Sequence, residues 1–359
     1  MIVSSPIQHP QPTLASFFSG AGGLDAGFKA AGFNTQWANE FDKRITPTFR
    51  ENFKETFLAE MSITDVSPDD IPDVDGYIGG PPCQSWSEAG ARRGILDPRG
   101  QLFLTYVDLL RENQPSFFLA ENVSGFLFDR NKEARTAILS AFADAGYNVS
   151  YGLLSAADYN VPQDRERVII VGFRVDSGLT FVPPEKSGHK VTLRDALRAV
   201  ELVEAQPVKF AERGFKQTSP ITSHHFLDSE HFSFIYMSRN RVRDWDEQSF
   251  TIQASGSHAP LHPSAPKMLR TQDRDVFEFA PGSPYRRLSV RECALIQTFP
   301  ADFKLLYDSV NLGYKVVGNA VPVEFAKAIA SSIYQQMSLG SIRYPRAARK
   351  FPAGQINRF

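Results

Sequence analysis

The chain has 359 residues, of which 42% are hydrophobic and 22% charged, and its formal net charge is −1. This composition is that of a soluble globular protein of two domains, and the balanced charge gives no global attraction toward nucleic acid. The chain contains no apolar run of roughly 18 residues or more, and its start, MIVSSPIQHPQPTL, lacks the charged and apolar regions of a signal peptide. We therefore expect a cytoplasmic protein with no membrane partner.

The two cysteines, Cys83 and Cys293, lie far apart in the sequence. Neither has the C-x-x-C or Cys/His spacing of a metal site, so the sequence suggests no disulfide framework and no metal. A free cysteine is most often a small buried hydrophobic residue, so packing in the core is the alternative to a chemical role for each of the two cysteines.

The first predicted element is a strand over residues 13–19, TLASFFS, which leads into the glycine turn GAGG and a helix with apolar residues at helical spacing. Gly20, Gly22 and Gly23 allow the turn to approach a ligand closely. The dinucleotide fingerprint G-x-G-x-x-G is incomplete, because its third glycine would fall at Asp25. The turn therefore favours a ligand without a pyrophosphate.

A short second strand in NTQWANEFD carries Glu40 at its end, about twenty residues after the glycines. At this position α/β folds place a carboxylate that accepts hydrogen bonds from ribose hydroxyls. Glu40 is equally consistent with a solvated acid at a strand end, and Asp42 is a weaker alternative for the ligand role. We place a third strand from about Ile63 and a fourth in DGYIGG, residues 75–80.

The stretch DGYIGGPPCQSWSEAG, residues 75–90, places Cys83 on a loop at the end of the fourth strand. A Pro-Pro step cannot continue a strand or enter a helix interior, so the thiol lies on a stiff loop. Loops at strand ends carry the chemistry of α/β proteins, so Cys83 is either a nucleophile or a packing residue. Residues 85–100 lack a sustained period and are typical of a surface loop that acts as a lid.

An amphipathic helix is expected over residues 101–113, and the buried strand SFFLAENV follows it. The carboxyl end of this strand presents Glu121 and Asn122, and the acid is either a strand-end cap or a functional group. A helix over residues 131–147 comes next, and two strands then meet around Pro162.

Gln163, Arg165 and Arg167 project to one side of the chain where it is extended, because side chains in a strand alternate with a period of two. The two arginines either cover the edge of the sheet or clamp a ligand that carries oxygen atoms. Residues 13–173 form the first part of the larger domain in this interpretation.

From residue 174 to residue 285 the alternation of strands and helices stops, which predicts a separate, smaller domain. Within residues 174–285, Arg239, Arg241 and Arg243 alternate with smaller residues and share one face if the chain is extended. Their guanidinium groups are either a solvated face or a set that makes bidentate contacts to guanine edges in a major groove.

Regular structure returns over residues 286–337, which complete the larger domain in this interpretation. Ser289 caps a helix, and Cys293 falls inside this helix as a packing residue. Residues 313–323 are predicted to form a glycine-containing turn before the last helix. The basic tail, residues 338–359, is expected to be loosely packed or disordered, with a phosphate contact as the alternative.

Taken together and in order, eight blocks of the chain resemble those of bacterial DNA cytosine-5 methyltransferases, and the resemblance extends from Leu14 to about Met337. The blocks are FFSGAGGLDAGF, NEFD, GGPPCQSWS, DPRGQLF, AENVSGF, VPQDRERVIIVGF, RRLSVRECALIQTFP and GYKVVGNAVPV. The resemblance implies an α/β, Rossmann-like fold of S-adenosylmethionine-dependent methyltransferases, with a smaller target-recognition domain inserted at residues 174–285.

The resemblance also implies roles for individual residues. Cys83 matches the nucleophile, Glu121 the acid, and Arg165, with Arg167 beside it, the arginine that bonds the carbonyl oxygen of cytosine. Contacts to S-adenosylmethionine are implied for Phe18, Ser19, Gly20, Gly22, Gly23, Leu24, Glu40, Phe41, Ser62, Ile63, Pro82, Leu102, Asn319 and Val321. Contacts to DNA are implied for Ser85, Arg92, Arg93, Arg239, Arg241 and Arg243.

In this chemistry a thiolate adds to carbon-6 of cytosine, which makes carbon-5 nucleophilic toward the methyl group. The base has to leave the duplex stack first, because the thiol cannot reach it there. The region from Tyr236 to Met268 is similar to that of methyltransferases that mark GGCC, so we expect double-stranded DNA containing GGCC as the substrate. We expect a monomer, and a cognate restriction endonuclease encoded nearby is the partner that such a role implies.

Other interpretations stay open at this point. A relative within the family methylates transfer RNA with the same residues, and a catalytically silent relative would only bind DNA. A nicotinamide-dependent dehydrogenase, which the glycine turn and Glu40 would suggest, is disfavoured by Asp25 and by the PPCQ loop.

Overall fold

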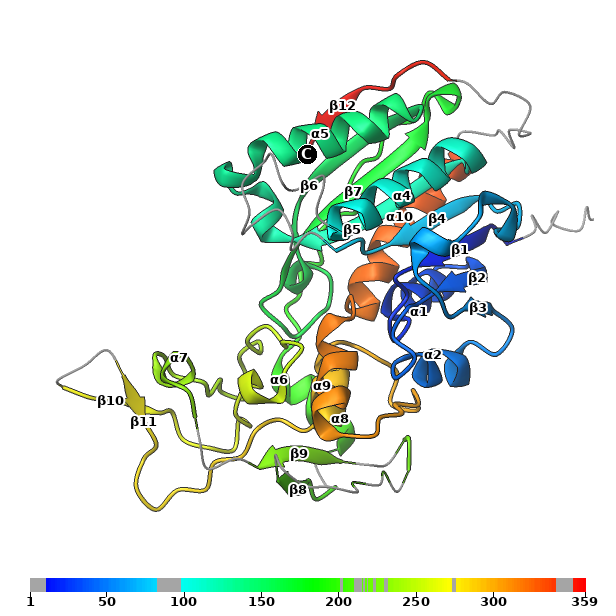
Figure 1. The fold of residues 1–359 in the computed structure, drawn as a ribbon. Coiled ribbons are helices and arrows are strands. Elements are labelled where there is room, and N and C mark those ends of the chain that lie inside the picture. The colour runs from blue at the N-terminus through cyan, green and yellow to red at the C-terminus, as the bar shows by residue number, and fades with distance from the viewer. Residues whose placement is uncertain are drawn as a thin grey trace, which may run out of the picture.

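The computed structural model describes residues 11–82, 98–200, 203–209, 215, 217, 219–221, 224–228, 232–272, 276–339 and 351–359. They form a larger lobe built on one sheet and a smaller lobe below it in the view of Figure 1. Strands and helices alternate through the larger lobe, which confirms the predicted α/β class.

The larger lobe is organised around an eight-stranded sheet with the strand order β12-β6-β7-β5-β4-β1-β2-β3. Its strands are β1 (Thr13–Phe17), β2 (Asn34–Asn39), β3 (Phe57–Ala59), β4 (Gly76–Gly79), β5 (Phe117–Val123), β6 (Tyr147–Ser155), β7 (Glu166–Arg174) and β12 (Ile356–Arg358). Neighbouring strands from β5 to β3 are parallel, whereas β7 runs antiparallel to both β5 and β6. The apolar runs of β1, β4 and β5 suit strands that are covered on both faces.

Helices cover both faces of this sheet. Their bounds are α1 (Gly23–Ala30), α2 (Thr46–Asn52), α4 (Pro98–Asn113), α5 (Lys132–Asp144) and α10 (Val323–Leu339). Helices α4 and α5 pack on the face that presents Phe17 and Phe118, while α1 and α10 pack on the face that presents Ile78. None of the helices in the described part of the chain combines the length and the hydropathy that a bilayer crossing demands.

The chain changes its direction across the sheet between β1 and β4. It leaves β1 toward β2 and β3 on one side, and it returns to β4 and β5 on the other. The connections that follow these two neighbouring strands therefore diverge and leave a crevice at their carboxyl ends, where open α/β sheets bind ligands. The glycine turn after β1 and the Pro81-Pro82 step after β4 both lie at this edge.

The smaller lobe contains short elements from the middle of the chain and two helices that follow them (Figure 1). These elements are α6 (Leu193–Leu197), β8 (Gln206–Lys209), β9 (His225–Asp228), α7 (Phe234–Met237), β10 (Leu269–Arg270), β11 (Phe277–Glu278), α8 (Val290–Ile296) and α9 (Val310–Asn319). One hydrophobic cluster joins α8 and α9 to α6, β8, β9 and also α2. The domain boundaries at residues 174–285 and 286–337 stay a prediction, and α8 and α9 pack with the smaller lobe.

The predicted cap of α8 is confirmed. Ser289 Oγ accepts a hydrogen bond from Glu292 N at 3.1 Å, and the Glu292 carboxylate accepts one from Ser289 N at 2.7 Å. Cys293 is fully buried within this helix, as expected for a packing residue.

The turn predicted for residues 313–323 was wrong. Helix α9 runs through most of these residues, and Ser309 caps its start. The glycines serve packing instead, because a Cβ at Gly318 would lie 2.3 Å from the carbonyl oxygen of Gln253. Glycine here allows another segment to approach the helix closely rather than turning the chain.

The third strand lies earlier than predicted. It is β3, which ends at Ala59, whereas Ile63–Asp65 forms a 3-10 helix. Ser62 Oγ accepts a hydrogen bond from Thr64 N and caps this helix, a local competition that favours a turn over a strand.

The end of the basic tail is packed rather than loose. Strand β12 pairs in parallel with β6, and the ring centroid of Phe359 lies 5.8 Å from that of Phe181. The expectation of a loose tail was therefore wrong for residues 351–359, and residues 340–350 lie outside the described part of the chain.

One buried acid lies directly beneath the glycine turn. Asp25 in the first turn of α1 is 0% exposed, its Oδ2 accepts a hydrogen bond from Ser16 Oγ at 3.0 Å, and its Oδ1 has no partner among the described residues. Burial raises the pKa of Asp25 to about 7. The folded protein therefore favours the uncharged carboxyl, whereas the unfolded chain ionises it at the usual aspartate pKa. The free energy of unfolding consequently falls as the pH rises from the usual aspartate range toward neutrality.

We predict that Asp25→Asn raises the melting temperature by a margin that grows between about pH 5 and about pH 8, reaching on the order of 5 °C, because the amide cannot ionise. The measurement is a thermal melt of both proteins across this pH range. The control is Asp69→Asn, a change of an exposed aspartate, which should leave the margin flat. A margin for Asp25→Asn that does not change with pH would contradict the prediction.

Candidate active site

The crevice between β1 and β4 opens into a cavity of about 560 Å³, a volume typical of sites for small molecules and cofactors. Residues that follow β1, β2, β4 and β5 line it, together with residues at the end of α9. The residues selected from the sequence that line this cavity are Phe18, Ser19, Gly20, Gly23, Leu24, Glu40, Pro82, Glu121, Asn319 and Val321.

The glycine turn forms one wall of this cavity. Phe18 has a left-handed backbone with φ of 53°, an uncommon conformation for a bulky residue that is found preferentially at functional sites. Gly23 lets the turn meet the end of α9, since a Cβ there would lie 2.3 Å from the carbonyl oxygen of Val321. Residues almost 300 positions apart in the sequence therefore share one wall.

Acids and one lysine line the neighbouring wall. Glu40 Oε2 accepts a hydrogen bond from Gly20 N at 2.9 Å, and its Oε1 accepts one from Asp42 N at 2.8 Å. Burial raises the pKa of Glu40, and the two backbone N–H groups partly offset this effect. Arg44, Lys315 and the Arg44 backbone N–H hold the pKa of Asp42 well below its usual range, with Arg44 as the largest cause.

The acid at the end of β5 is held by the second arginine of the sequence QDRER. Arg167 Nε lies 2.7 Å from Glu121 Oε1, and both side chains are largely buried. A Cβ at Gly80 would lie 3.3 Å from Glu121 Oε2, so the acid faces the end of β4 closely. Glu121 therefore has one oxygen fixed by a guanidinium and the other beside the loop that leads to Cys83.

Pro82 is the last described residue before Cys83. The preceding carbonyl oxygen, of Pro81, accepts a hydrogen bond from Asn122 Nδ2 at 3.1 Å, which ties the start of the loop to β5. Cys83 itself lies outside the described residues, as do the predicted DNA contacts Ser85, Arg92 and Arg93, and the roles given to them stay predictions.

The structure does not bring Arg165 to the cavity wall. Arg165 is 2% exposed, and its Nη atoms donate to the carbonyl oxygens of Ile252, Gly318 and Ala320 at 3.0 to 3.1 Å. Burial lowers the pKa of Arg165 to about 9, with the charge of Arg167 as a second cause. The two arginines of this motif thus differ, because one lies in the interior and the other faces Glu121.

Other residues selected for cofactor contact lie away from the cavity wall. Phe41 is 71% exposed, and Ser62 caps a 3-10 helix. Ile63 and Leu102 pack against the cluster beneath α4. Gly22 is the left-handed residue that precedes α1. None of these five is among the described residues that line the cavity.

The three arginines of the smaller lobe line a separate cavity of about 330 Å³. Arg241 is buried and donates from Nε to Tyr236 O at 2.7 Å. Arg243 pairs with Asp164 at 2.7 Å, whereas Arg239 is exposed. The arginines share one surface, as predicted, but two of them are bound by groups of the protein.

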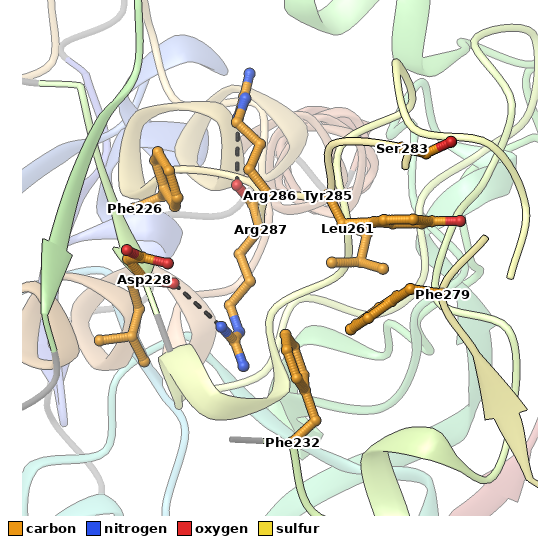
Figure 2. A pocket seen from close by; sticks show the side chains of 10 residues that line it. Phe226, Asp228, Phe232, Leu261, Phe279, Ser283, Tyr285, Arg286 and Arg287 are labelled. Atoms are coloured by element: carbon orange, nitrogen blue, oxygen red, sulfur yellow. Dashed lines mark hydrogen bonds between the residues drawn. The ribbon is translucent and has the colours of Figure 1, made fainter. Parts of the chain in front are cut away.

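A third cavity, of about 240 Å³, lies in the smaller lobe. In Figure 2, Arg287 runs between Asp228 on one side and Phe232 on the other, and its Nη1 donates to Leu227 O at 3.1 Å. The guanidinium carbon lies 4.3 Å from the ring centroid of Phe232. These contacts tie the strand before α7 to the segment before α8, and the cavity is lined by residues of the smaller lobe alone.

Two cations of the site were not selected from the sequence. Lys315 lines the cavity and pairs with Asp42 at 2.8 Å, and Arg130 lines it beyond the end of β5. Lys315 lies within the GYKVVGNAVPV block, which was a usable signal. Arg130 lies in a single turn of 3-10 helix, Asp129–Asn131, which is too short for a sequence period to predict.

A sequence profile described as C-5 cytosine-specific DNA methylase matches residues 13–335. The chain is 50% identical over 325 residues to the Type II methyltransferase M.MthTI of Methanothermobacter thermautotrophicus. This alignment covers 90% of this chain and 97% of that protein. It is 48% identical over 330 residues to the Type II methyltransferase M.FnuDI of Fusobacterium nucleatum. That alignment covers 90% of this chain and 95% of the relative.

A solved structure shares the fold. The methyltransferase EhMeth of Entamoeba histolytica superposes with a TM-score of 0.65 at 16% identity, over 92% of this chain and 99% of that one. The resemblance seen in the sequence blocks is confirmed by the profile, which spans most of the chain, and by the relatives. The chain belongs to the C-5 cytosine-specific DNA methylase family and is a DNA (cytosine-5)-methyltransferase with the Rossmann-like methyltransferase fold.

Proposed function

We propose that this enzyme moves the methyl group of S-adenosylmethionine to carbon-5 of a cytosine everted from a short specific sequence in duplex DNA. The observation that carries the proposal is one cavity that holds the glycine turn, Glu40, Pro82 and Glu121. A ribose-binding acid and a base-binding acid thereby share one space, as direct transfer between two bound molecules requires.

The residues of this cavity fit S-adenosylmethionine. Each Glu40 oxygen accepts one backbone hydrogen bond and retains a further lone pair for a ribose hydroxyl. The absence of a side chain at Gly23 keeps the turn close to Val321. Phe18, Glu40, Pro82 and Asn319 would hold the cofactor, which supplies an electrophilic methyl group on a sulfonium when bound.

Cys83 is the proposed nucleophile, because it follows Pro82, which lines the cavity, by one peptide bond. Its thiolate forms a bond to carbon-6 of cytosine, and the electron pair of the ring double bond becomes available at carbon-5 to take the methyl group. The bond between the methyl carbon and the donor sulfur would break at the same time, and its electron pair would stay on that sulfur, which would leave as an uncharged thioether. Loss of the carbon-5 proton then restores the double bond and breaks the bond to sulfur, which frees the thiolate. Atoms and charge balance over the two steps.

Glu121 and Arg167 are proposed to bind the ring during this addition. Addition of the thiolate places negative charge on the ring, and Glu121 relieves it by holding a proton at the ring nitrogen N3. We assign to Arg167, instead of Arg165, the bond to the carbonyl oxygen of the base. The support is the 2.7 Å contact from Arg167 to Glu121, whereas the Nη atoms of Arg165 serve three backbone carbonyls.

We propose GGCC within duplex DNA as the target sequence, read from the smaller lobe with Arg239 as the exposed member of the three arginines. Guanidinium groups recognise guanine through two parallel hydrogen bonds in the major groove. The relatives at 48 to 50% identity are named Type II methyltransferases, which supports a role as the modification half of a restriction-modification system with an endonuclease partner.

We predict that duplex DNA with 5-fluorocytosine at the target position forms an adduct with the wild-type enzyme that survives denaturing electrophoresis. Fluorine cannot leave as a proton does, so the bond to sulfur stays intact. Cys83→Ser should form no adduct, and Cys293→Ala, a change of the buried second cysteine, should retain it. An adduct formed by Cys83→Ser would contradict the role of Cys83.

The two arginines of the motif should separate in their effects. Arg167→Gln should lower kcat by about 10²-fold with a nearly unchanged melting temperature, since it removes a group that faces the reacting ring. Arg165→Gln should lower the free energy of unfolding by about 3 kcal/mol, because buried carbonyl oxygens lose their donors. Steady-state kinetics and chemical denaturation measure the two effects. The reverse pattern would return the ring-binding role to Arg165.

Bisulfite sequencing of DNA from cells that express the enzyme should find methylated cytosine in GGCC and unmethylated cytosine in other tetranucleotides. Methylation of another short sequence would replace GGCC and leave the reaction intact.

A parallel assay with purified transfer RNA should give methyl incorporation at least about 10²-fold below that with duplex DNA, since a lobe with arginines on one surface suits a major groove. Preference for transfer RNA would overturn duplex DNA as the substrate.

A further inference from the structure

The segment that follows Glu121 forms a projecting rim on the catalytic cavity. Val123, Gly125, Phe126 and Arg130 all line this cavity. Apolar side chains stand exposed along the rim, since Val123 is 49% exposed and Phe128 is 51% exposed. Large apolar side chains that stay exposed beside a cavity mark a surface where another molecule lies.

Hydrogen bonds hold this rim in one conformation. Asn131 Nδ2 donates to Gly125 O at 2.7 Å and closes the segment on itself. Arg135 Nη1, from α5, donates to Phe126 O at 3.3 Å and to Phe128 O at 3.4 Å. The Phe126 side chain is 1% exposed and anchors the segment to the core. The rim is therefore a rigid surface rather than a mobile loop.

The rim carries a cation that is not neutralised by the protein. The Arg130 guanidinium carbon lies 5.2 Å from the ring centroid of Phe128, and no carboxylate of the described residues pairs with it. Lys315, the other described cation of the cavity wall, is paired with Asp42 at 2.8 Å. An exposed arginine that is oriented by an aromatic ring and lacks an acid partner is arranged to meet an anion.

We propose that Arg130 binds a backbone phosphate of the DNA strand that carries the target cytosine, with the exposed ring of Phe128 supporting the guanidinium. The inference rests on the proposed function. A base that enters the cavity beside Glu121 draws its sugar and phosphates across the rim, because the nucleotide rotates out of the duplex about its backbone. The Arg130 contact would stabilise the everted strand without reading its sequence.

A carboxylate of the cofactor is the other anion that could meet Arg130, since both molecules share the cavity. The two contacts differ in their dependence on salt concentration and in whether DNA has to be bound. A phosphate contact acts only when DNA is bound and contributes about one unit to the slope of log K against log salt concentration. A cofactor contact acts in the absence of DNA.

The test uses the full-length enzyme and three variants: Arg130→Gln, Arg130→Lys and Lys132→Gln. Lys132 is an exposed cation two residues from Arg130 that does not line the cavity, so it controls for a general loss of positive charge. Fluorescence anisotropy measures Kd for a duplex that contains the site mapped by bisulfite sequencing, across a series of salt concentrations. Calorimetry measures the Kd for S-adenosylmethionine alone.

For Arg130→Gln we expect DNA binding weakened on the order of tenfold at low salt, and a salt slope reduced by about one. Arg130→Lys should keep most of the slope, Lys132→Gln should match the wild type, and cofactor affinity should not change. The inference is overturned if Lys132→Gln loses as much as Arg130→Gln. It is also overturned if Arg130→Gln weakens cofactor binding while the salt slope stays constant. Failure of the wild type to bind or methylate any duplex would instead overturn the proposed function.

Discussion

A fully buried guanidinium holds the functional parts of this enzyme together. Arg165 has no carboxylate partner among the described residues, and its two Nη atoms donate to the carbonyl oxygens of Ile252, Gly318 and Ala320, while its buried Nε has no hydrogen-bond partner among those residues. Its pKa of about 9 leaves it charged at neutral pH, so those oxygens have to stay in place to compensate a buried charge. The requirement fixes the end of α9, and the chain that leaves α9 lines the cavity opposite the glycine turn.

The surrounding amides extend this arrangement between the lobes. Gln163 accepts a hydrogen bond from Ile252 N at 2.9 Å and donates to Gln297 Oε1 at 2.8 Å. Gln297 in turn donates to the carbonyl oxygens of Val317 and Ala320. Buried amide side chains that are bonded in this way resist rearrangement, because each broken bond would leave a buried polar atom without a partner. A continuous set of side-chain hydrogen bonds therefore joins the segment around Ile252 to the end of α9, beside the cavity.

The sequence predicted what local rules determine. The glycine turn, the strand before the Pro-Pro step, the strand that ends at Glu121 and the capped helix α8 all lie where their patterns indicated. It could not predict what depends on distant partners. Period-two spacing gave Arg165 and Arg167 the same side of the chain, but whether another segment covers a side chain is a property of the packed fold. Gly318 misled for the same reason, since the backbone of Gln253 that it admits is remote in sequence.

The sequence pattern gave no indication that the exposed Arg130 lies at the cavity, because the segment around it has no regular spacing of apolar residues. Its neighbour Asn131 and the helical Arg135 define that segment through side-chain bonds to backbone carbonyls, which sequence patterns do not encode. Motif spacing therefore located Glu121 and the glycine turn on the cavity, while the charges at the cavity mouth depend on the folded structure.

Strand β12 has a consequence for the behaviour of the protein in concentrated solution. Without it, β6 would be an outermost strand of nine residues, with a row of open backbone donors and acceptors that could recruit a second molecule. The three residues of β12 pair with Val149, Ser150 and Tyr151 in the first half of β6, and the short strand that covers them carries Asn357 and Arg358. At the opposite border, β3 is equally short. Both borders of the sheet thus discourage fibre-like association.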